Sequence, residues 1–74
     1  SSDLIQAQLI DLLMKLKEKL GMAIIFISHD LRLVRKIADK ICVMKDGKIE
    51  QSGNHHTLAA SDGLYKLLLQ GKSA

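Results

Sequence analysis

The sequence predicts an α/β fold in which helices flank a short, mainly parallel sheet and a small β-hairpin follows. Three observations predict this class. Residues 3–20 carry apolar side chains at helical spacing, residues 22–27 form an unbroken apolar run rich in Ile, and Asp46-Gly47 separates two strand-like runs. A helix that feeds a buried strand is half of an α/β unit. Because a core of 74 residues seldom supplies more than about 3–5 kcal/mol, residues 1–74 are expected to be one domain or a piece of a larger one.

The first helix is expected over residues 3–20. Its apolar residues recur every three or four positions, which places them on one face, while Lys15 and Lys17 face water. Gly21 is the expected C-terminal stop. We expect the apolar face to pack into the core rather than to form an oligomer seam, because it spans too few heptads for a coiled coil. That face consists of Leu4, Ile5, Leu9, Leu12, Leu13, Leu16 and Leu20.

Residues 22–27 predict a strand that is buried on both faces, as strands are in the middle of a parallel sheet. Asp30 then predicts the start of a second helix, since its carboxylate can accept hydrogen bonds from the free backbone amides of the first turn. The apolar side of this helix is formed by Leu31, Leu33, Val34, Ile37 and Ala38.

A hairpin is expected from strands at residues 40–44 and 48–51. Asp46-Gly47 lies between them, and both positions of a tight hairpin turn need a positive φ angle, which this pair tolerates. Cys42 is the only cysteine, cannot form an internal disulfide, and is expected to be a small buried side chain in a protein of a reducing compartment.

Two short helices are expected to close the chain, at residues 55–61 and 62–70. Leu64, Leu67 and Leu68 are expected on the inner face of the second. Residues 71–74 are expected to form a frayed tail.

Composition indicates a globular protein. Hydrophobic residues make up 47% of the chain and charged residues 26%, so a packed core is expected and disorder is not. The apolar runs fall far short of the roughly 18–20 residues that a membrane span needs. The net charge of +3 comes from lysines interspersed with acids, which is typical of a solvated helix face, so nucleic acid is not an expected partner.

His29 is the candidate functional residue. It follows the predicted strand at its carboxyl end, where open α/β sheets place their ligands, and precedes a helix N-terminus, where backbone amides favour an anion. A histidine there can donate a hydrogen bond to a phosphate oxygen or to an attacking water. The residues alone leave open the alternative that Ser28 and Asp30 cap the helix and His29 is a polar loop residue.

Two other catalytic or metal-binding arrangements are excluded by geometry. Ser28, His29 and Asp30 cannot form a hydrolytic triad, because adjacent side chains cannot reach one another in the required relay. His55 and His56 diverge by about 100° on a helix and no acid cluster joins them, so no metal site is expected. The sequence also has no G-x-x-x-x-G-K-[ST] loop to cradle phosphates.

The stretch QAQLIDLLMKLKEKLGMAIIFISHDLRLVRKIADKICVMKDGKIEQSG resembles the C-terminal third of the ATPase domain of ABC transporters. FISHDL, IAD, VMKDGKI and SG follow one another at that family's distances, and the resemblance covers roughly residues 5 to 70. It implies a fragment of a P-loop NTPase-like domain in which His29 is the switch histidine of the H-loop. In that family this histidine contacts the γ-phosphate of ATP and helps to position the attacking water and the catalytic glutamate. Gly47 matches the turn glycine of the hairpin.

The resemblance also implies cofactors and partners. The intact domain would use ATP and Mg²⁺, whereas this fragment is expected to bind neither tightly, because the Walker A, signature and Walker B motifs would lie upstream of residue 1. It is therefore expected to be inactive alone. The implied partners are the rest of the ATPase domain, a second ATPase domain and transmembrane transporter subunits, which would hold the protein in the cytoplasm at the inner face of the membrane.

The transported substrate and its direction stay open. The first half of the chain is similar to importers of the peptide and nickel type, and residues 53–70 are similar to the end of export-type half transporters. The alternative function is a small non-enzymatic α/β module that uses its leucine-rich faces to bind a protein partner or a second copy of itself. A further alternative keeps the same ancestry and makes the chain a remnant or engineered piece that self-associates, since unpaired sheet edges favour pairing between chains.

Overall fold

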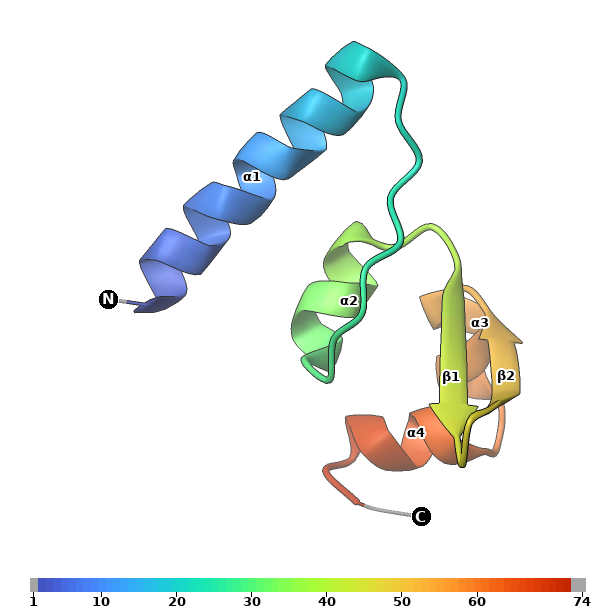
Figure 1. Cartoon of the computed structure of the whole chain (residues 1–74). Coiled ribbons are helices and arrows are strands. Elements are labelled where there is room, and N and C mark those ends of the chain that lie inside the picture. The colour runs from blue at the N-terminus through green and yellow to red at the C-terminus, as the bar shows by residue number, and fades with distance from the viewer. Residues whose placement is uncertain (1, 73–74) are drawn as a thin grey trace.

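The computed structural model of the chain describes residues 2–72, and the side chains of residues 4–72. Figure 1 shows a long helix that projects away from a group of smaller elements, with an extended segment joining the two. The hairpin and the last two helices lie together at the C-terminal end (Figure 1). In chain order the elements are α1 (Ser2–Leu20), α2 (Leu31–Ile37), β1 (Ile41–Lys45), β2 (Lys48–Gly53), α3 (His55–Ala60) and α4 (Leu64–Leu69).

The first predicted helix is confirmed as α1, and it ends where expected. Gly21, the residue after α1, has a φ of 65°, and the N–H of Met22 donates to the carbonyl of Lys17 at 3.0 Å. This is the bond that closes a helix when the next residue is left-handed. The expectation that the apolar face of α1 packs into the core is wrong. Leu9 is 62% exposed and Leu12 55%, because no other element of the described chain lies against that face.

The predicted strand at residues 22–27 is wrong. This segment is irregular, and Ile25 and Ile27 are each 93% exposed. A strand is completed only when a neighbouring strand takes up its backbone N–H and C=O groups, and no described part of the chain pairs with this one. The mainly parallel sheet is therefore not formed: the sheet within residues 2–72 is two-stranded and antiparallel.

The predicted hairpin is confirmed as β1 and β2. Asp46 and Gly47 form its two-residue loop with φ angles of 53° and 76°, the positive values that such a turn requires. Lys45 pairs with Lys48 beside the turn, and a register shift falls between Val43 and Met44.

A small core lies against the hairpin and combines residues of β1, α3 and α4. Ile41 and Val43 point inward from β1 and meet Leu58 of α3 and Tyr65 of α4. Cys42 is exposed, so its predicted burial is wrong, because successive strand residues point to opposite faces. The partly buried side chains around this core are Leu31, Val34, Ala38, Ala59, Leu64 and Leu69.

The final helix is confirmed as α4, and its inner face is confirmed in part. Leu64 packs against the core as predicted, whereas Leu67 and Leu68 are 37% and 38% exposed. Tyr65 is the fully buried residue of this helix. Residues 73 and 74 of the predicted frayed tail lie outside the described residues. The N–H groups of Gly71 and Lys72 donate to carbonyls of α4 at 3.0 and 2.9 Å.

Candidate functional site

His29 lies in the loop between the irregular segment 22–27 and α2, with its side chain exposed to solvent. Within the described residues its imidazole makes no hydrogen bond or ion pair. The ring therefore contributes little to holding the fold together and is free to meet a ligand.

The two neighbours of His29 shape the backbone on either side of it. The hydroxyl of Ser28 accepts a hydrogen bond from the N–H of Asp30 at 3.0 Å. Asp30 has extended backbone angles, and its carboxylate accepts from the N–H of Arg32 at 3.1 Å, so it is the N-cap of α2 as predicted. Ser28 and Asp30 are thus engaged in starting the helix.

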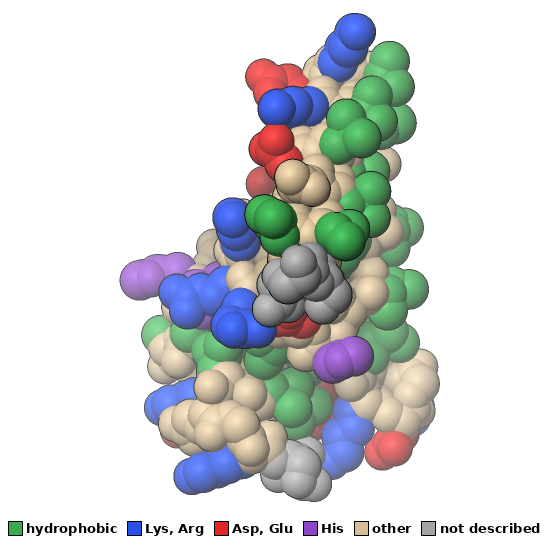
Figure 2. Space-filling model, turned by 90° about the vertical axis from the view of Figure 1, so that its left-hand side faces the viewer, with side chains coloured by type: hydrophobic (Ala, Val, Ile, Leu, Met, Phe, Trp, Pro, Cys, Tyr) green, Lys and Arg blue, Asp and Glu red, His purple; other side chains and the backbone are tan. Residues whose placement is uncertain are grey.

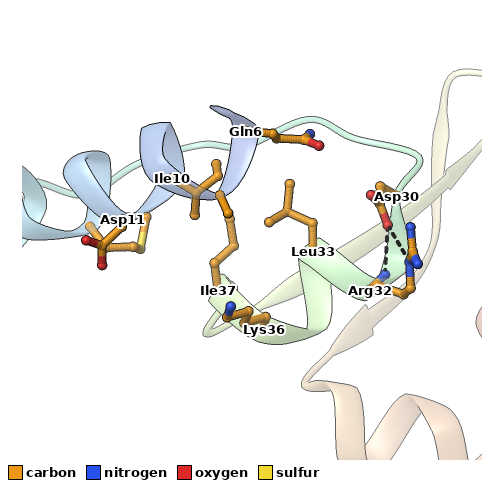
Figure 3. Close-up of a pocket in the computed structure, with 10 residues that line it drawn as sticks. Gln6, Ile10, Asp11, Asp30, Arg32, Leu33, Lys36 and Ile37 are labelled. Atoms are coloured by element: carbon orange, nitrogen blue, oxygen red, sulfur yellow. Dashed lines mark hydrogen bonds and ion pairs between the residues drawn. The ribbon is translucent and has the colours of Figure 1, made fainter. Parts of the chain in front are cut away.

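The charged groups nearest to the helix start form a pair of their own. Arg32 lies with its Nε 3.6 Å from the carboxylate of Asp30, as Figure 3 shows. Because the Arg32 side chain is 92% exposed, this ion pair is worth at most about 1 kcal/mol.

A groove of about 660 Å³ lies between α1 and α2. In Figure 3 the apolar side chains of Ile10, Leu33 and Ile37 lie toward one another across it, and Asp30, Arg32 and Lys36 lie at its margin. His29 is not among the residues that line it. The groove and the candidate histidine are therefore separate features, and the ten lining residues are Gln6, Ala7, Ile10, Asp11, Met14, Asp30, Arg32, Leu33, Lys36 and Ile37.

A second histidine makes a contact that the sequence did not reveal. Nδ1 of His55 lies 2.8 Å from the hydroxyl of Tyr65, and the two rings meet edge to face with centroids 5.7 Å apart. Burial raises the pKa of the Tyr65 phenol, while the positive charge of Arg35 lowers it by a smaller amount. Gln51 holds the same residue by its backbone, since its side-chain oxygen accepts from the Tyr65 N–H at 2.9 Å.

His55 therefore has a structural contact rather than a metal-binding one. Its ring is half-buried against Tyr65, whereas His56 is exposed. Across residues 2–72 no group of three or more His, Cys, Asp or Glu side chains is placed to hold a metal ion.

Comparison with known proteins gives a consistent set of relatives. The chain is 53% identical over 49 residues to the peptidoglycan transport ATP-binding protein YejF of Agrobacterium fabrum, and 46% identical over 54 residues to the dipeptide transport ATP-binding protein DppD of Escherichia coli. It is 45% identical over 47 residues to the methionine import ATP-binding protein MetN of Lactobacillus delbrueckii subsp. bulgaricus. These matches cover 66%, 73% and 64% of this chain.

The match covers only a small part of each relative: the chain spans 9%, 16% and 13% of their respective lengths. No family model matches the sequence, and no solved structure matches it. Among the helices of residues 2–72, none combines the length and apolar character that crossing a bilayer requires. The homologues of this chain are ATP-binding proteins of ABC transporters, and it corresponds to a short stretch of each.

Proposed function

We propose that this chain is a C-terminal part of the ATPase domain of an ABC transporter, and that His29 is its switch histidine. The identity of 45–53% to three transport ATP-binding proteins carries the proposal. Any stretch of 47 residues within a chain of 74 must include residues 28–47, so His29 falls inside each of the three matched regions.

The surroundings of His29 support the same role. Its side chain is exposed and makes no contact that the fold needs, while Ser28 and Asp30 shape the backbone around it. A neutral imidazole carries one N–H donor and one acceptor nitrogen. His29 can therefore donate to an oxygen of a terminal phosphate, or hold a water that attacks it, without giving up a structural bond.

The residues present fit one contact to a nucleotide rather than a whole nucleotide site. Mg-ATP, when bound to the intact domain, supplies the phosphoryl group that is transferred to water. His29 would face that terminal phosphate. The phosphate loop and the metal ligands would come from other parts of the domain, so the 74-residue chain is expected to be inactive by itself.

The wider role follows from the relatives and is part of the proposal. Three of them are named for transport or import, so the intact protein would couple ATP hydrolysis to movement of a substrate across a membrane. It would act on the cytoplasmic side with a second ATPase domain and with transmembrane subunits.

A chimera tests the proposal directly. The stretch of the Escherichia coli dipeptide transport ATP-binding protein that matches this chain, 54 residues long, is replaced by the matching residues of this chain, and ATP hydrolysis is measured. We expect the chimera to hydrolyse ATP and the His29→Ala chimera to lose about a hundredfold or more in rate, as removal of a donor at a developing charge does.

His56→Ala is the matched control, where it falls within the exchanged stretch, because His56 is also an exposed histidine with no proposed role in catalysis. It should leave the rate unchanged. A His29→Ala chimera with the full rate would refute the switch-histidine role, and an inactive parent chimera would refute the equivalence of the exchanged stretches.

A further inference from the structure

His29 is tied to α2, because short-range hydrogen bonds join its loop to the start of that helix. The N–H of Asp30 donates to the hydroxyl of Ser28 at 3.0 Å. Asp30 in turn accepts from two amides of the helix, the N–H of Arg32 at its carboxylate and the N–H of Val34 at its carbonyl. A capped start of this kind fixes how the chain enters a helix. Whatever holds α2 in place therefore also sets where His29 lies.

α2 depends on other elements for its position. It has seven residues, none of them buried, and a helix this short is not stable in water without packing. α1 gives it little cover: Figures 1 and 2 show α1 projecting away from the other elements, and in Figure 2 apolar side chains run along one side of it. A groove separates the two helices, and Leu33 and Ile37 face it (Figure 3).

The side of α2 that has cover faces the small core. Leu31, Val34 and Ala38 are partly buried and pack against the core residues of β1, α3 and α4. Leu31 is the first residue of α2 and comes two positions after His29. The contact with the core therefore begins at the end of the helix that carries His29.

Tyr65 is the member of this core that is held most firmly. Its side chain is fully buried, its hydroxyl lies 2.8 Å from Nδ1 of His55, and its N–H donates to the side chain of Gln51. Gly63 leaves room for that second bond, because a Cβ there would lie 2.5 Å from Nε2 of Gln51. Burial raises the pKa of the Tyr65 phenol and the positive charge of Arg35 lowers it, so a charged group of α2 also lies near the phenol.

We propose that Tyr65 is a positioning residue for His29. The last two helices and β2 hold Tyr65, the core around Tyr65 holds α2, and α2 carries the loop with His29. The inference rests on the proposed function for its catalytic consequence. The link from Tyr65 to residues 28–30 can be measured in the isolated chain, where no nucleotide takes part.

NMR of the isolated chain tests which contact holds α2, with one matched variant on each side of the helix. Leu31→Ala removes a side chain that packs on the core, and Leu33→Ala removes the same side chain from the side that faces the groove. Both changes favour the helix equally by propensity. We expect the helical Cα shifts of residues 31–37 to lose about half or more of their size in Leu31→Ala and to stay unchanged in Leu33→Ala.

Variants of Tyr65 test its own part. Tyr65→Leu removes the ring and should reduce the same Cα shifts and move the amide signal of His29. Tyr65→Phe keeps the ring against the core and should keep the signals of residues 29–37. Gln51→Ala is the milder variant in case Tyr65→Leu unfolds the hairpin, because it removes only the bond to the Tyr65 N–H. It should move the signals of residues 29–37 in the same direction.

The chimera described under the proposed function tests the catalytic consequence, with the exchanged stretch extended to residue 72. Tyr65→Leu should lower kcat about tenfold or more, as misplacement of a catalytic group does, and Tyr65→Phe should restore it. KM for ATP should stay within about twofold, because the phosphate loop comes from elsewhere in the domain.

Combination with His29→Ala separates positioning from stability. Once His29 is absent, Tyr65→Leu should lower kcat no further, since the residue through which it acts is gone. A substitution that merely reduced the amount of folded protein would lower the rate by the same factor in both backgrounds.

Two results would overturn the proposal. One is a folded Tyr65→Leu or Gln51→Ala chain in which the signals of residues 29–37 stay where they are in the parent. The other is an equal loss of rate with and without His29, which would make Tyr65 a residue of stability alone. Failure of the proposed function is distinguished by a His29→Ala chimera that keeps the full rate, and the spectra of the isolated chain then decide the positioning role.

Discussion

Tyr65 is the residue on which the small core depends most. It is fully buried, its hydroxyl lies 2.8 Å from Nδ1 of His55, and its N–H donates to the side chain of Gln51. One side chain thus links α4 to α3, and its backbone links α4 to β2.

The His55–Tyr65 hydrogen bond should stabilise the C-terminal part of the chain. Tyr65→Phe removes the hydroxyl and keeps the ring, and it should lower the free energy of unfolding by about 1 kcal/mol. His55→Ala should cost more, about 1–3 kcal/mol, because it leaves a buried hydroxyl without a partner. Urea unfolding followed by circular dichroism measures both values.

His56→Ala is the control for this pair. His56 is exposed on the same helix, so its removal should change the free energy of unfolding by less than about 0.5 kcal/mol. An effect of His56→Ala as large as that of His55→Ala would contradict the assigned role of the hydrogen bond.

Ionisation of Tyr65 should make the stability fall at high pH. Burial raises the phenol's pKa above its ordinary value of 10.0, so above pH 10 the unfolded chain loses this proton more readily than the folded one. The protonated phenol's contribution to the free energy of unfolding is therefore complete below pH 10. It is lost as the pH rises through the pKa of Tyr65 in the folded chain. Unfolding midpoints in urea from pH 9 upward measure this fall.

Tyr65→Phe provides the comparison, since Tyr65 is the only tyrosine and every other side chain is the same in the two proteins. The variant should lose less stability than the parent between pH 10 and pH 11. Equal losses in the two proteins would show that the phenol does not contribute.

Among the elements, residues 22–27 should be the least protected part of the chain between α1 and β1. The segment is irregular and two of its isoleucines are almost fully exposed, whereas β1 pairs with β2 along its length. Amide hydrogen exchange by NMR should therefore show fast exchange at residues 23–27 and slow exchange within β1. Comparable protection in the two segments would mean that residues 22–27 pair with another strand in solution.

Local signals account for the elements that the sequence predicted correctly. Asp46-Gly47 specifies its turn through backbone preference alone, and Asp30 caps α2 through a bond to a residue two positions away. Gly21 ends α1 in the same local way. The turn, the cap and the helix end each depend on contacts within a few residues, so they can be predicted without the rest of the fold.

Non-local contacts account for the errors. Burial of residues 22–27 and of the apolar face of α1 requires other segments that pack against them. Hydrophobicity indicates that a segment tends to be buried, but it does not identify the segment that buries it. Cys42 was misplaced because the phase of a strand decides which face its residues take. The His55–Tyr65 contact joins two helices across ten positions, and no rule of sequence spacing predicts it. His29 is a candidate by its position before a helix start, and its switch-histidine role comes from the resemblance alone.

At the scale of the whole molecule, α1 and the C-terminal elements are weakly joined. Within the described residues, Lys17 of α1 forms an ion pair at 3.4 Å with Asp39, which lies in the loop between α2 and β1, and the Asp39 side chain is 91% exposed. Such a surface pair contributes at most about 1 kcal/mol. No helix or strand of the described chain packs broadly against α1, so α1 gains little stability from the rest of the fold.

Heating should therefore separate the two parts. An uncovered helix of 19 residues is marginal in water, so the helical signal in circular dichroism should begin to fall before the near-ultraviolet signal of Tyr65, which reports on the core. Coincident transitions would instead mean that α1 and the core unfold as one cooperative unit.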